Sequence, residues 1–253
     1  MSVDPNHASV AGDALSGSCS FANEELPSPL PVEPFAMFRA WMDEAHSKKS
    51  QPNPNAMTLC TVDPNGKPSG RVVLCRMVDA GGNYIVFFTN YDSRKGEGLE
   101  HHGYASVVFH WDHLDRQVRM EGRIVRSPAA ESDAYFARRP VMSRVAAWAS
   151  EQSRPIASRA DLMARNAEAE RRFGIVRTGD GDDGVTVPKD IVVPRPPNWG
   201  GYRLWPEHVE LWLGHSWRLH DRARWSRTLT VSRGAAGEDV LAAGAWRVTR
   251  LQP

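Results

Sequence analysis

Residues 116–126 alternate between apolar and polar side chains, and this alternation constrains the fold more than any other feature of the sequence. In an extended chain Val118, Met120 and Ile124 fall on one face, while Gln117 and Arg119 fall on the other. This pattern is typical of an antiparallel strand with one face in the core and one toward solvent. The segment therefore predicts a half-buried antiparallel sheet.

Runs of β-branched and aromatic residues predict further strands on both sides of this segment. The turn sequence Asp-Pro-Asn-Gly-Lys-Pro at residues 63–68 separates two of them, so we expect a hairpin there. The predicted strands, besides residues 116–126, are residues 56–62, 69–78, 84–89, 104–111, 202–205, 209–213, 220–227 and 246–251.

Apolar residues at helical spacing predict a helix over residues 33–48. Further helices are predicted at residues 129–138, 142–150 and 158–173, the last capped by Ser158, and a short one at Gly96. Together the patterns predict a mainly β fold with helices, a closed antiparallel barrel with an inserted helical segment. We expect one domain over residues 33–253, a disordered arm at residues 1–32, and exposed loops at residues 174–198 and 228–245.

Charge and cysteine content argue against several classes of function. The 253 residues carry 31 basic and 30 acidic side chains, a net charge of +1, which gives no electrostatic case for nucleic-acid or membrane-surface binding. No apolar run is long enough to span a membrane. The three cysteines lack metal-ligand spacing, so we expect no metal site and a reducing, cytoplasmic location. Arg39 is the first basic residue, so neither a secretory signal nor a transit peptide is expected before it.

Several common cofactor and nucleophile motifs are missing from the sequence. It has no dinucleotide-binding glycine fingerprint, no Walker loop, no G-x-S-x-G elbow and no H-E-x-x-H. Residues 180–184 resemble the start of a calcium loop, but Ile191 occupies the twelfth position, where the bidentate carboxylate is needed. His110 and His113 have no third candidate ligand, so we expect ordinary packed or surface histidines.

Cationic and hydroxyl side chains gather where one predicted strand ends and a short helix begins. Arg94 and Lys95 follow Thr89 and Ser93 at this junction, where backbone N–H groups can help to hold a phosphate. A solvated turn is the alternative. Arg71 on the preceding strand would complete a clamp. Arg76 is an odd number of residues from Arg71, so a regular strand would point the two side chains to opposite faces. Either a bulge brings both arginines to one site, or two ligands lie on different sides of the strand.

A series of short motifs follows in order from about residue 34 to the C-terminus. They are Arg71-Val72-Val73-Leu74-Cys75-Arg76, Phe88-Thr89, Ser93-Arg94-Lys95, Arg116-Gln117, Tyr135-Phe136-Ala137-Arg138-Arg139-Pro140, Ala147-Trp148-Ala149-Ser150-Glu151-Gln152-Ser153, Trp199-Gly200-Gly201, Arg218-Leu219-His220-Asp221-Arg222 and Arg250-Leu251-Gln252-Pro253. Together they resemble the pyridoxamine 5'-phosphate oxidase family. An ordered series of this kind is far more specific than any single motif.

The resemblance implies an FMN-binding split β-barrel that forms a homodimer, with FMN bound across the subunit interface. Three groups of residues would bind FMN by position. The phosphate and ribityl chain would contact Arg71, Arg94, Lys95, Gln117 and Ser153; the ring would contact Gln152, Trp212 and Arg222; and backbone contacts would come from Phe88 and Thr89.

The same resemblance implies a phosphorylated pyridine substrate. Its phosphate would be held by Tyr135, Arg139, Ser143 and Arg76, while Arg218 and His220 would sit over its ring as catalytic residues. The implied reaction oxidises pyridoxamine 5'-phosphate or pyridoxine 5'-phosphate to pyridoxal 5'-phosphate, with dioxygen as acceptor and hydrogen peroxide as product. Two phosphorylated ligands need two anion clamps, and FMN would carry the redox chemistry while the protein orients the substrate.

The sequence departs from the family pattern in three places. Arg76 stands where the family usually has Lys, and Leu213 replaces a common Gln. The family's Arg-bearing segment before the first helix is here Asn23-Glu24-Glu25-Leu26-Pro27, whose carboxylates would repel a phosphorylated substrate.

Three alternative functions stay open. One is a related flavin oxidase acting on a dihydro-aromatic, phenazine-type biosynthetic intermediate. The others are a non-catalytic flavin or pyridoxal-phosphate binding protein and an RNA-binding barrel. Tyr135, Arg139 and Ser143 together favour a phosphorylated substrate, Arg218 and His220 argue against a protein without turnover, and the near-zero net charge argues against RNA.

Overall fold

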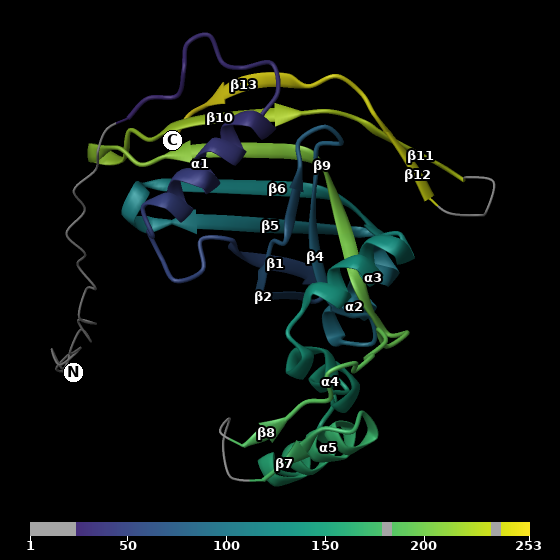
Figure 1. Ribbon diagram of the computed structural model, residues 1–253. Coiled ribbons are helices and arrows are strands. Elements are labelled where there is room, and N and C mark those ends of the chain that lie inside the picture. Colours follow the sequence, from purple (N-terminus) through teal and green to yellow (C-terminus); the bar gives the residue numbers. More distant parts are fainter. Residues whose placement is uncertain (1–23, 179–183, 234–238) are drawn as a thin grey trace, which may run out of the picture.

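The computed structural model describes residues 24–178, 184–233 and 239–253 (Figure 1). Its helices are α1 (Phe35–Ser47), α2 (Arg94–His102), α3 (Ala129–Arg138), α4 (Val141–Ala149) and α5 (Arg159–Arg172), with short 3-10 helices η1 (Asp112–Leu114) and η2 (Ser216–Arg218). Its strands are β1 (Ala56–Val62), β2 (Pro68–Leu74), β3 (Met77–Asp79), β4 (Tyr84–Asn90), β5 (Tyr104–Trp111), β6 (Arg116–Arg126), β7 (Val176–Arg177), β8 (Val185–Thr186), β9 (Trp199–Leu213), β10 (Asp221–Ser226), β11 (Leu229–Arg233), β12 (Asp239–Ala243) and β13 (Arg247–Leu251).

A nine-stranded antiparallel sheet closes on itself to form a split barrel. The strand order is β13-β10-β9-β6-β5-β1-β2, and β4 pairs with both β9 and β3. The predicted strand 69–78 is interrupted at Cys75 and Arg76, where the chain stops pairing with β1 and begins to pair with β4. This interruption closes the barrel and removes the opposite-parity constraint on the two arginines of that segment.

β9 is one long strand where the sequence predicted two. The prediction stopped at Pro206 because proline lacks the N–H that a central strand needs. In the structure Pro206 lies opposite Gly122 at a register shift between β6 and β9, so the strand continues through a bulge. β9 therefore pairs with β4 along its first half and with β10 along its second half.

The barrel interior is built from the alternating faces of these strands. Val118 and Met120 are fully buried on β6, as their alternation predicted. Phe35 and Phe38 of α1 are also fully buried, and in Figure 1 this helix lies across the sheet. Among the described residues, none of the helices is long and apolar enough to cross a membrane.

The inserted helices carry a small hydrophobic cluster of their own. Phe136 of α3, Val145 of α4 and Ala169 of α5 pack with Ile175, Val193 and Trp199. In Figure 1 α4 and α5 extend away from the sheet, with the β7–β8 ladder beside α5. Residues 174–198, expected as an exposed loop, thus contribute both a two-stranded ladder and buried side chains, apart from residues 179–183, which lie outside the described part.

Parts of two segments predicted to lack structure are packed or paired in the structure. Within the predicted arm 1–32, Leu26 is 3% exposed and packs into the barrel core, and Pro31 O accepts a hydrogen bond from Trp225 Nε1. Residues 1–23 of that arm lie outside the described residues. Within the predicted loop 228–245, β11 and β12 pair as an antiparallel ladder. In Figure 1 this ladder extends beyond β10 and β13.

Candidate active site

Two hydroxyls around the end of β4 and the amide of Gln152, which was predicted to contact the flavin ring, converge on the amine of Lys95. Lys95 Nζ donates to Thr89 Oγ1 and Ser93 Oγ, each at 3.1 Å, and to Gln152 Oε1 at 2.5 Å. Ser93 also caps α2, because its Oγ accepts from Gly96 N–H at 3.3 Å. The start of α2, the end of β4 and the loop after α4 therefore meet at Lys95. We call Arg71, Thr89, Arg94, Lys95 and Gln152 the β4–α2 group.

Burial and mutual repulsion act on the cations of the β4–α2 group. Arg71 donates to Thr61 Oγ1 at 2.8 Å and to Ser69 Oγ at 2.9 Å, which fixes it beside β1. Burial lowers the pKa of Arg71, and the charge of Arg94 lowers it further. Burial and the charge of Arg71 together lower the pKa of Lys95 to about 8. An anion bound between these cations would relieve their repulsion.

Two glycines allow β4 to lie close to β9 at this place. A Cβ on Gly200 would lie 2.0 Å from Tyr91 Oη, and one on Gly201 would lie 2.8 Å from Phe88 Cε1. Real Cβ atoms do not approach other atoms so closely. The Trp-Gly-Gly motif at residues 199–201 thus has a steric reason: it lets Phe88 and Thr89 sit against β9 in the register Phe88↔Gly201 and Thr89↔Gly200.

The predicted substrate-phosphate residues lie next to the β4–α2 group, on α3 and α4. Tyr135 stacks on Phe88, with ring centres 3.9 Å apart and planes at 6°. The Arg139 guanidinium lies 4.8 Å from the ring centre of Trp199. A cavity of about 250 Å³ brings Arg139, Ser143 and Gln152 together. The predicted FMN and substrate residues therefore share one cavity wall here.

Arg139 has a buried donor that lacks a protein partner. Its Nη1 atom is buried and makes no hydrogen bond within the described residues. Burial lowers the pKa of Arg139, and the charge of Arg76 adds to this effect, so the two arginines lie close enough to repel each other. A buried donor without a partner is costly unless a ligand satisfies it. We call Arg76, Tyr135, Arg139 and Ser143 the α3–α4 group.

The remaining predicted residues lie at the other end of β9. Gln117 of β6 pairs with Trp212 of β9, and Trp212 pairs with Arg222 of β10, so the three form one row across the sheet. Gln117 was predicted to contact the phosphate and ribityl chain together with Arg71; within one protomer it lies in this row, on β6 rather than on the strand of Arg71. We call Gln117, Trp212, Arg218, His220 and Arg222 the β9–β10 group, and Figure 1 shows the two ends of β9 well apart.

The two predicted catalytic residues lie in the loop between β9 and β10. The His220 and Trp212 ring centres are 4.6 Å apart. Burial lowers the pKa of His220, and the nearby charges of His215, Arg218 and Arg222 act in the same direction. Arg218 is exposed and has a left-handed backbone with φ of 62°. It forms no ion pair with Glu210 or Asp221, which bind Arg222 and Arg250 instead.

The separation of the two ends follows from strand geometry. Gly200 and Trp212 are twelve steps apart on β9, a path of about 40 Å at roughly 3.3 Å per residue, although the bend at Pro206 makes the direct distance shorter. Thr89 pairs with the first and Gln117 with the second. A single protomer thus brings the β4–α2 and α3–α4 groups together and places the β9–β10 group at the opposite end of β9.

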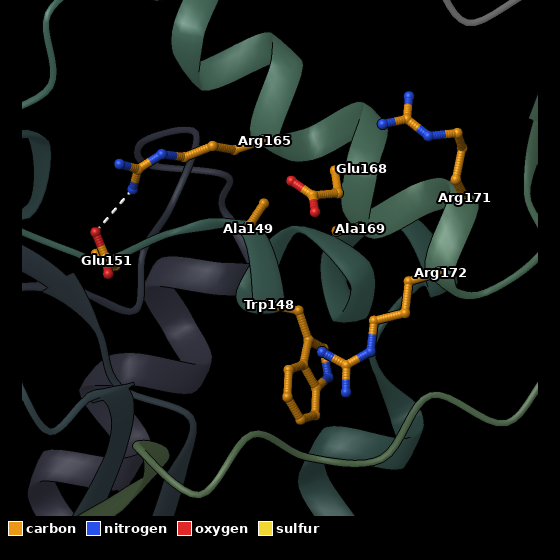
Figure 2. A pocket seen from close by; sticks show the side chains of 8 residues that line it. All are labelled: Trp148, Ala149, Glu151, Arg165, Glu168, Ala169, Arg171 and Arg172. Carbon is orange, nitrogen blue, oxygen red and sulfur yellow. Dashed lines mark hydrogen bonds and ion pairs between the residues drawn. The ribbon is translucent and has the colours of Figure 1, made fainter.

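A larger cavity lies outside these groups. It measures about 760 Å³ and lies between α4 and α5, lined by Trp148, Ala149, Glu151, Arg165, Glu168, Ala169, Arg171 and Arg172 (Figure 2). Arg165 pairs with Glu151 at 2.7 Å, and none of the predicted site residues lines the cavity. Within the described ranges, no group of three or more His, Cys, Asp or Glu side chains could hold a metal ion.

Two residues beside the predicted site groups, Glu210 and Arg154, were not predicted from the sequence. Glu210 is buried and accepts from Arg222 Nε at 3.1 Å and Nη2 at 2.9 Å. Its position opposite Arg222 on a neighbouring strand becomes visible only once the β9–β10 register is known. Arg154, next to Ser153 whose φ is 72°, pairs with Glu97 of α2 at 2.7 Å and ties the loop after α4 to that helix. No motif marked this contact.

The fold and these groups define a split-barrel protein with two neighbouring clusters of cationic side chains. A family model described as Pyridoxamine 5'-phosphate oxidase matches residues 42–172, and one described as Pyridoxine 5'-phosphate oxidase C-terminal dimerisation region matches residues 199–253. The chain belongs to the pyridoxamine 5'-phosphate oxidase family.

Individual relatives agree with this assignment. The chain is 47% identical over 221 residues to the pyridoxine/pyridoxamine 5'-phosphate oxidase of Burkholderia multivorans, which covers 87% of this chain and 89% of that protein. It also resembles the crystal structure of PhzG from Burkholderia lata in complex with tetrahydrophenazine-1-carboxylic acid, with a TM-score of 0.74, 28% identity, and coverage of 92% of this chain and 100% of that one. An FMN-binding protein from Nostoc punctiforme, 17% identical with a TM-score of 0.58 over 88% of this chain and 100% of that one, shares the fold.

Proposed function

We propose that the protein is an FMN-dependent oxidase that converts pyridoxamine 5'-phosphate or pyridoxine 5'-phosphate to pyridoxal 5'-phosphate, with dioxygen as acceptor and hydrogen peroxide as product. The observation that carries this proposal is the pairing of two adjacent cationic groups, one around Lys95 and one around Arg139. A phosphorylated cofactor and a phosphorylated substrate need two such clamps side by side.

The residues present fit a flavin mononucleotide. The β4–α2 group combines three cations with hydroxyl and amide groups, and the carboxylate of Asp63 lies 3.6 Å from Arg94. That excess of positive charge suits a phosphate dianion. The indole of Trp212 and the guanidinium of Arg222 suit a flat ring with carbonyl oxygens. The β4–α2 group would hold the phosphate and ribityl chain, and the β9–β10 group would hold the ring.

The proposed site is shared between two protomers. The two groups lie at opposite ends of β9, a strand of 15 residues, and we infer that one FMN molecule does not reach both ends within one protomer. One protomer would therefore supply the β4–α2 and α3–α4 groups, and its partner would supply the β9–β10 group. The match of residues 199–253 to a dimerisation region supports a homodimer in which β9 and β10 contribute to the interface.

The protein's own residues would bind, orient and hold protons. When bound, FMN supplies the capacity to accept a hydride from the substrate and pass electrons to dioxygen. Arg139, Ser143 and Tyr135 would hold the substrate phosphate, with Arg76 adding charge. Arg218 would oppose negative charge that develops on the substrate ring, and His220 would hold or exchange a proton at a ring substituent. The binding energy of the phosphate would thus fix the substrate's reacting carbon against the flavin.

A second candidate substrate comes from the structural likeness to PhzG. That protein was crystallised with tetrahydrophenazine-1-carboxylic acid, a reduced ring that carries a carboxylate and no phosphate. The buried, unpartnered Nη1 of Arg139 favours an additional anionic group on the substrate and so favours a B6 phosphate. The two candidates differ in what the α3–α4 group must bind.

The test is to purify the protein, release its cofactor and assay both substrate classes. We expect FMN rather than FAD, and aldehyde and peroxide formed from pyridoxine or pyridoxamine 5'-phosphate. Recovery of FAD, or absence of flavin after reconstitution, would contradict the cofactor assignment. Turnover of a dihydro-phenazine acid without turnover of either B6 phosphate would replace the substrate assignment.

A further inference from the structure

Residues 24–27, which we call the strap, bind both ends of the loop at residues 214–220. At the loop's start, His215 Nε2 donates a hydrogen bond to the carbonyl oxygen of Glu24. At the loop's end, the backbone N–H of Leu26 donates to Asp221 Oδ2 at 2.8 Å. Arg250 completes the contact, because Nη1 pairs with Asp221 Oδ1 at 2.5 Å and Nη2 donates to Leu26 O at 3.2 Å. The strap therefore joins the N-terminal segment to the loop that carries Arg218 and His220.

The strap is itself fixed to the barrel. Leu26 is buried in the main core, and Glu24 Oε2 accepts from Arg116 Nη2 at 2.7 Å. Arg116 is buried, also pairs with Glu44 and lies 5.1 Å from the ring centre of Trp41. The carboxylate of Glu24, expected to repel a phosphorylated substrate, is thus neutralised by an arginine on β6. Its structural role is to hold the strap in place.

The loop held by the strap has a strained backbone. Trp217 and Arg218 have φ values of 60° and 62°, the left-handed region that residues with a Cβ rarely occupy. Such conformations persist only where surrounding contacts impose them, and they cluster at binding sites. Here the imposed contacts include the two strap bonds, one at each end of the loop.

A hydrogen bond within the loop sets which ring nitrogen of His220 carries the proton. The backbone N–H of His215 donates to His220 Nδ1 at 3.1 Å, so that nitrogen carries no proton and the neutral ring has its proton on Nε2. Trp212 lies beside this ring, at 4.6 Å between ring centres. The imidazole of His220 is therefore fixed in both orientation and tautomer by its neighbours.

We propose that His215 is a positioning residue: by tying the strap to the loop through Glu24, it holds the His215 amide against His220 and keeps His220 as a neutral imidazole with an Nε2–H donor. This inference rests on the proposed function, in which His220 faces the substrate ring. His215 does not itself need to contact cofactor or substrate.

The experiment compares His215→Ala with His215→Gln in the full chain. The amide of Gln can donate from a position similar to that of imidazole Nε2, whereas Ala cannot. His208→Ala is the matched control, because His208 lies on β9 and hydrogen-bonds a side chain, Ser226 Oγ at 3.1 Å, away from the strap. The measurements are the tautomer and titration of His220 by long-range ¹H–¹⁵N NMR, and the steady-state kinetics with pyridoxine 5'-phosphate.

We expect the Nε2–H tautomer for His220 in the wild type, His215→Gln and His208→Ala, and a mixture of tautomers in His215→Ala. We expect kcat to fall about tenfold in His215→Ala with flavin content unchanged, and to recover in His215→Gln. The wild-type tautomer and wild-type kcat in His215→Ala would overturn the inference, as would a loss in His215→Gln equal to that in His215→Ala. The NMR comparison needs no substrate, so absence of B6-phosphate turnover in the wild type would count against the proposed function alone.

Discussion

Arg222 Nη2 lies 2.9 Å from Glu210 Oε1, and Arg222 Nε lies 3.1 Å from the same oxygen. Glu210 is buried and also lies 3.5 Å from Arg119, so one carboxylate separates two arginines. This contact fixes the guanidinium that we assign to the flavin ring. Glu210 on β9 is therefore the support on which an Arg222 contact to FMN would depend.

We predict that Glu210→Gln weakens FMN binding by about tenfold, equivalent to roughly 1.4 kcal/mol, because Arg222 loses its charged partner and must be held at entropic cost. Flavin titration by fluorescence quenching measures this. Glu121→Gln is the matched control, since Glu121 pairs with Arg119 at 2.5 Å and makes no contact with Arg222. Equal FMN affinities in the two variants would contradict the assigned role of Glu210.

A second prediction separates the two cationic groups. Arg94→Ala should weaken FMN binding, because it removes a charge-assisted phosphate contact worth about 1.5–3 kcal/mol. Arg139→Ala should keep its flavin and raise KM for a B6 phosphate, because Arg139 is assigned to the substrate. Flavin content after gel filtration and KM from peroxide formation test both variants. If the two variants lose flavin equally, the groups do not serve two ligands.

A third prediction concerns pH and Lys95. Burial and Arg71 lower the pKa of this amine from 10.5 to about 8 in the ligand-free protein. A bound phosphate favours the protonated amine, so FMN binding takes up a proton above about pH 8. FMN affinity should therefore be nearly constant from pH 7 to 8 and fall by up to about tenfold per pH unit above that, until the pKa of the complex is reached.

The control for this pH dependence is Lys95→Arg. A guanidinium stays protonated through the measured range, so the fall in affinity above pH 8 should disappear even if the absolute affinity changes. Isothermal titration in buffers of different ionisation enthalpy reports the proton uptake directly. A fall of the same size in Lys95→Arg would assign the titration to another group.

A fourth prediction tests the shared site. Arg218→Ala should lower turnover of a B6 phosphate at least about tenfold, roughly 1.4 kcal/mol of transition-state stabilisation, with flavin content and dimerisation unchanged. Arg139→Ala should also be impaired. The two residues lie near opposite ends of β9. In a mixed dimer one site would carry both substitutions and the other neither.

Co-expression of Arg139→Ala and Arg218→Ala chains should therefore restore activity to about a quarter of the wild-type value, because random pairing gives half mixed dimers with one intact site each. Purification on two different tags isolates the mixed dimer and should raise this to about a half. A mixed dimer as impaired as the separate variants would place the whole site within one protomer.

The alternation of residues 116–126 was enough to predict β6, and the turn at residues 63–68 was enough to predict the β1–β2 hairpin. Both signals are local. The break at Cys75 and Arg76 depends on which strands lie beside it, so the predicted strand 69–78 was too long. The bulge at Pro206 also depends on the neighbouring strand, so the sequence predicted two strands where β9 is one. The strap was missed because a single buried side chain, Leu26, anchors a stretch of otherwise low apolar content.

The candidate site divides in the same way. The sequence placed Thr89, Ser93 and Lys95 at one strand-to-helix junction, and the Lys95 amine hydrogen-bonds to both hydroxyls. Gln152, which was expected at the flavin ring, hydrogen-bonds to the same amine. Nothing local in the sequence shows that Gln117 lies with Trp212 rather than with Arg71, because that depends on the β6–β9 register. The ion pair between Glu210 and Arg222 could not be predicted either, because it depends on which residues of β9 and β10 lie beside each other.

The length of β9 has a consequence for how the protein would retain FMN in a cell. If each cofactor must touch two protomers, an isolated chain has two half-sites and no complete one, and cofactor retention becomes a function of protein concentration. Dilution would then release flavin together with the subunit contact, and added FMN would shift the assembly equilibrium toward the dimer. The fraction of dimer would therefore increase with the FMN concentration, because β9 places the two half-sites of each protomer at its opposite ends.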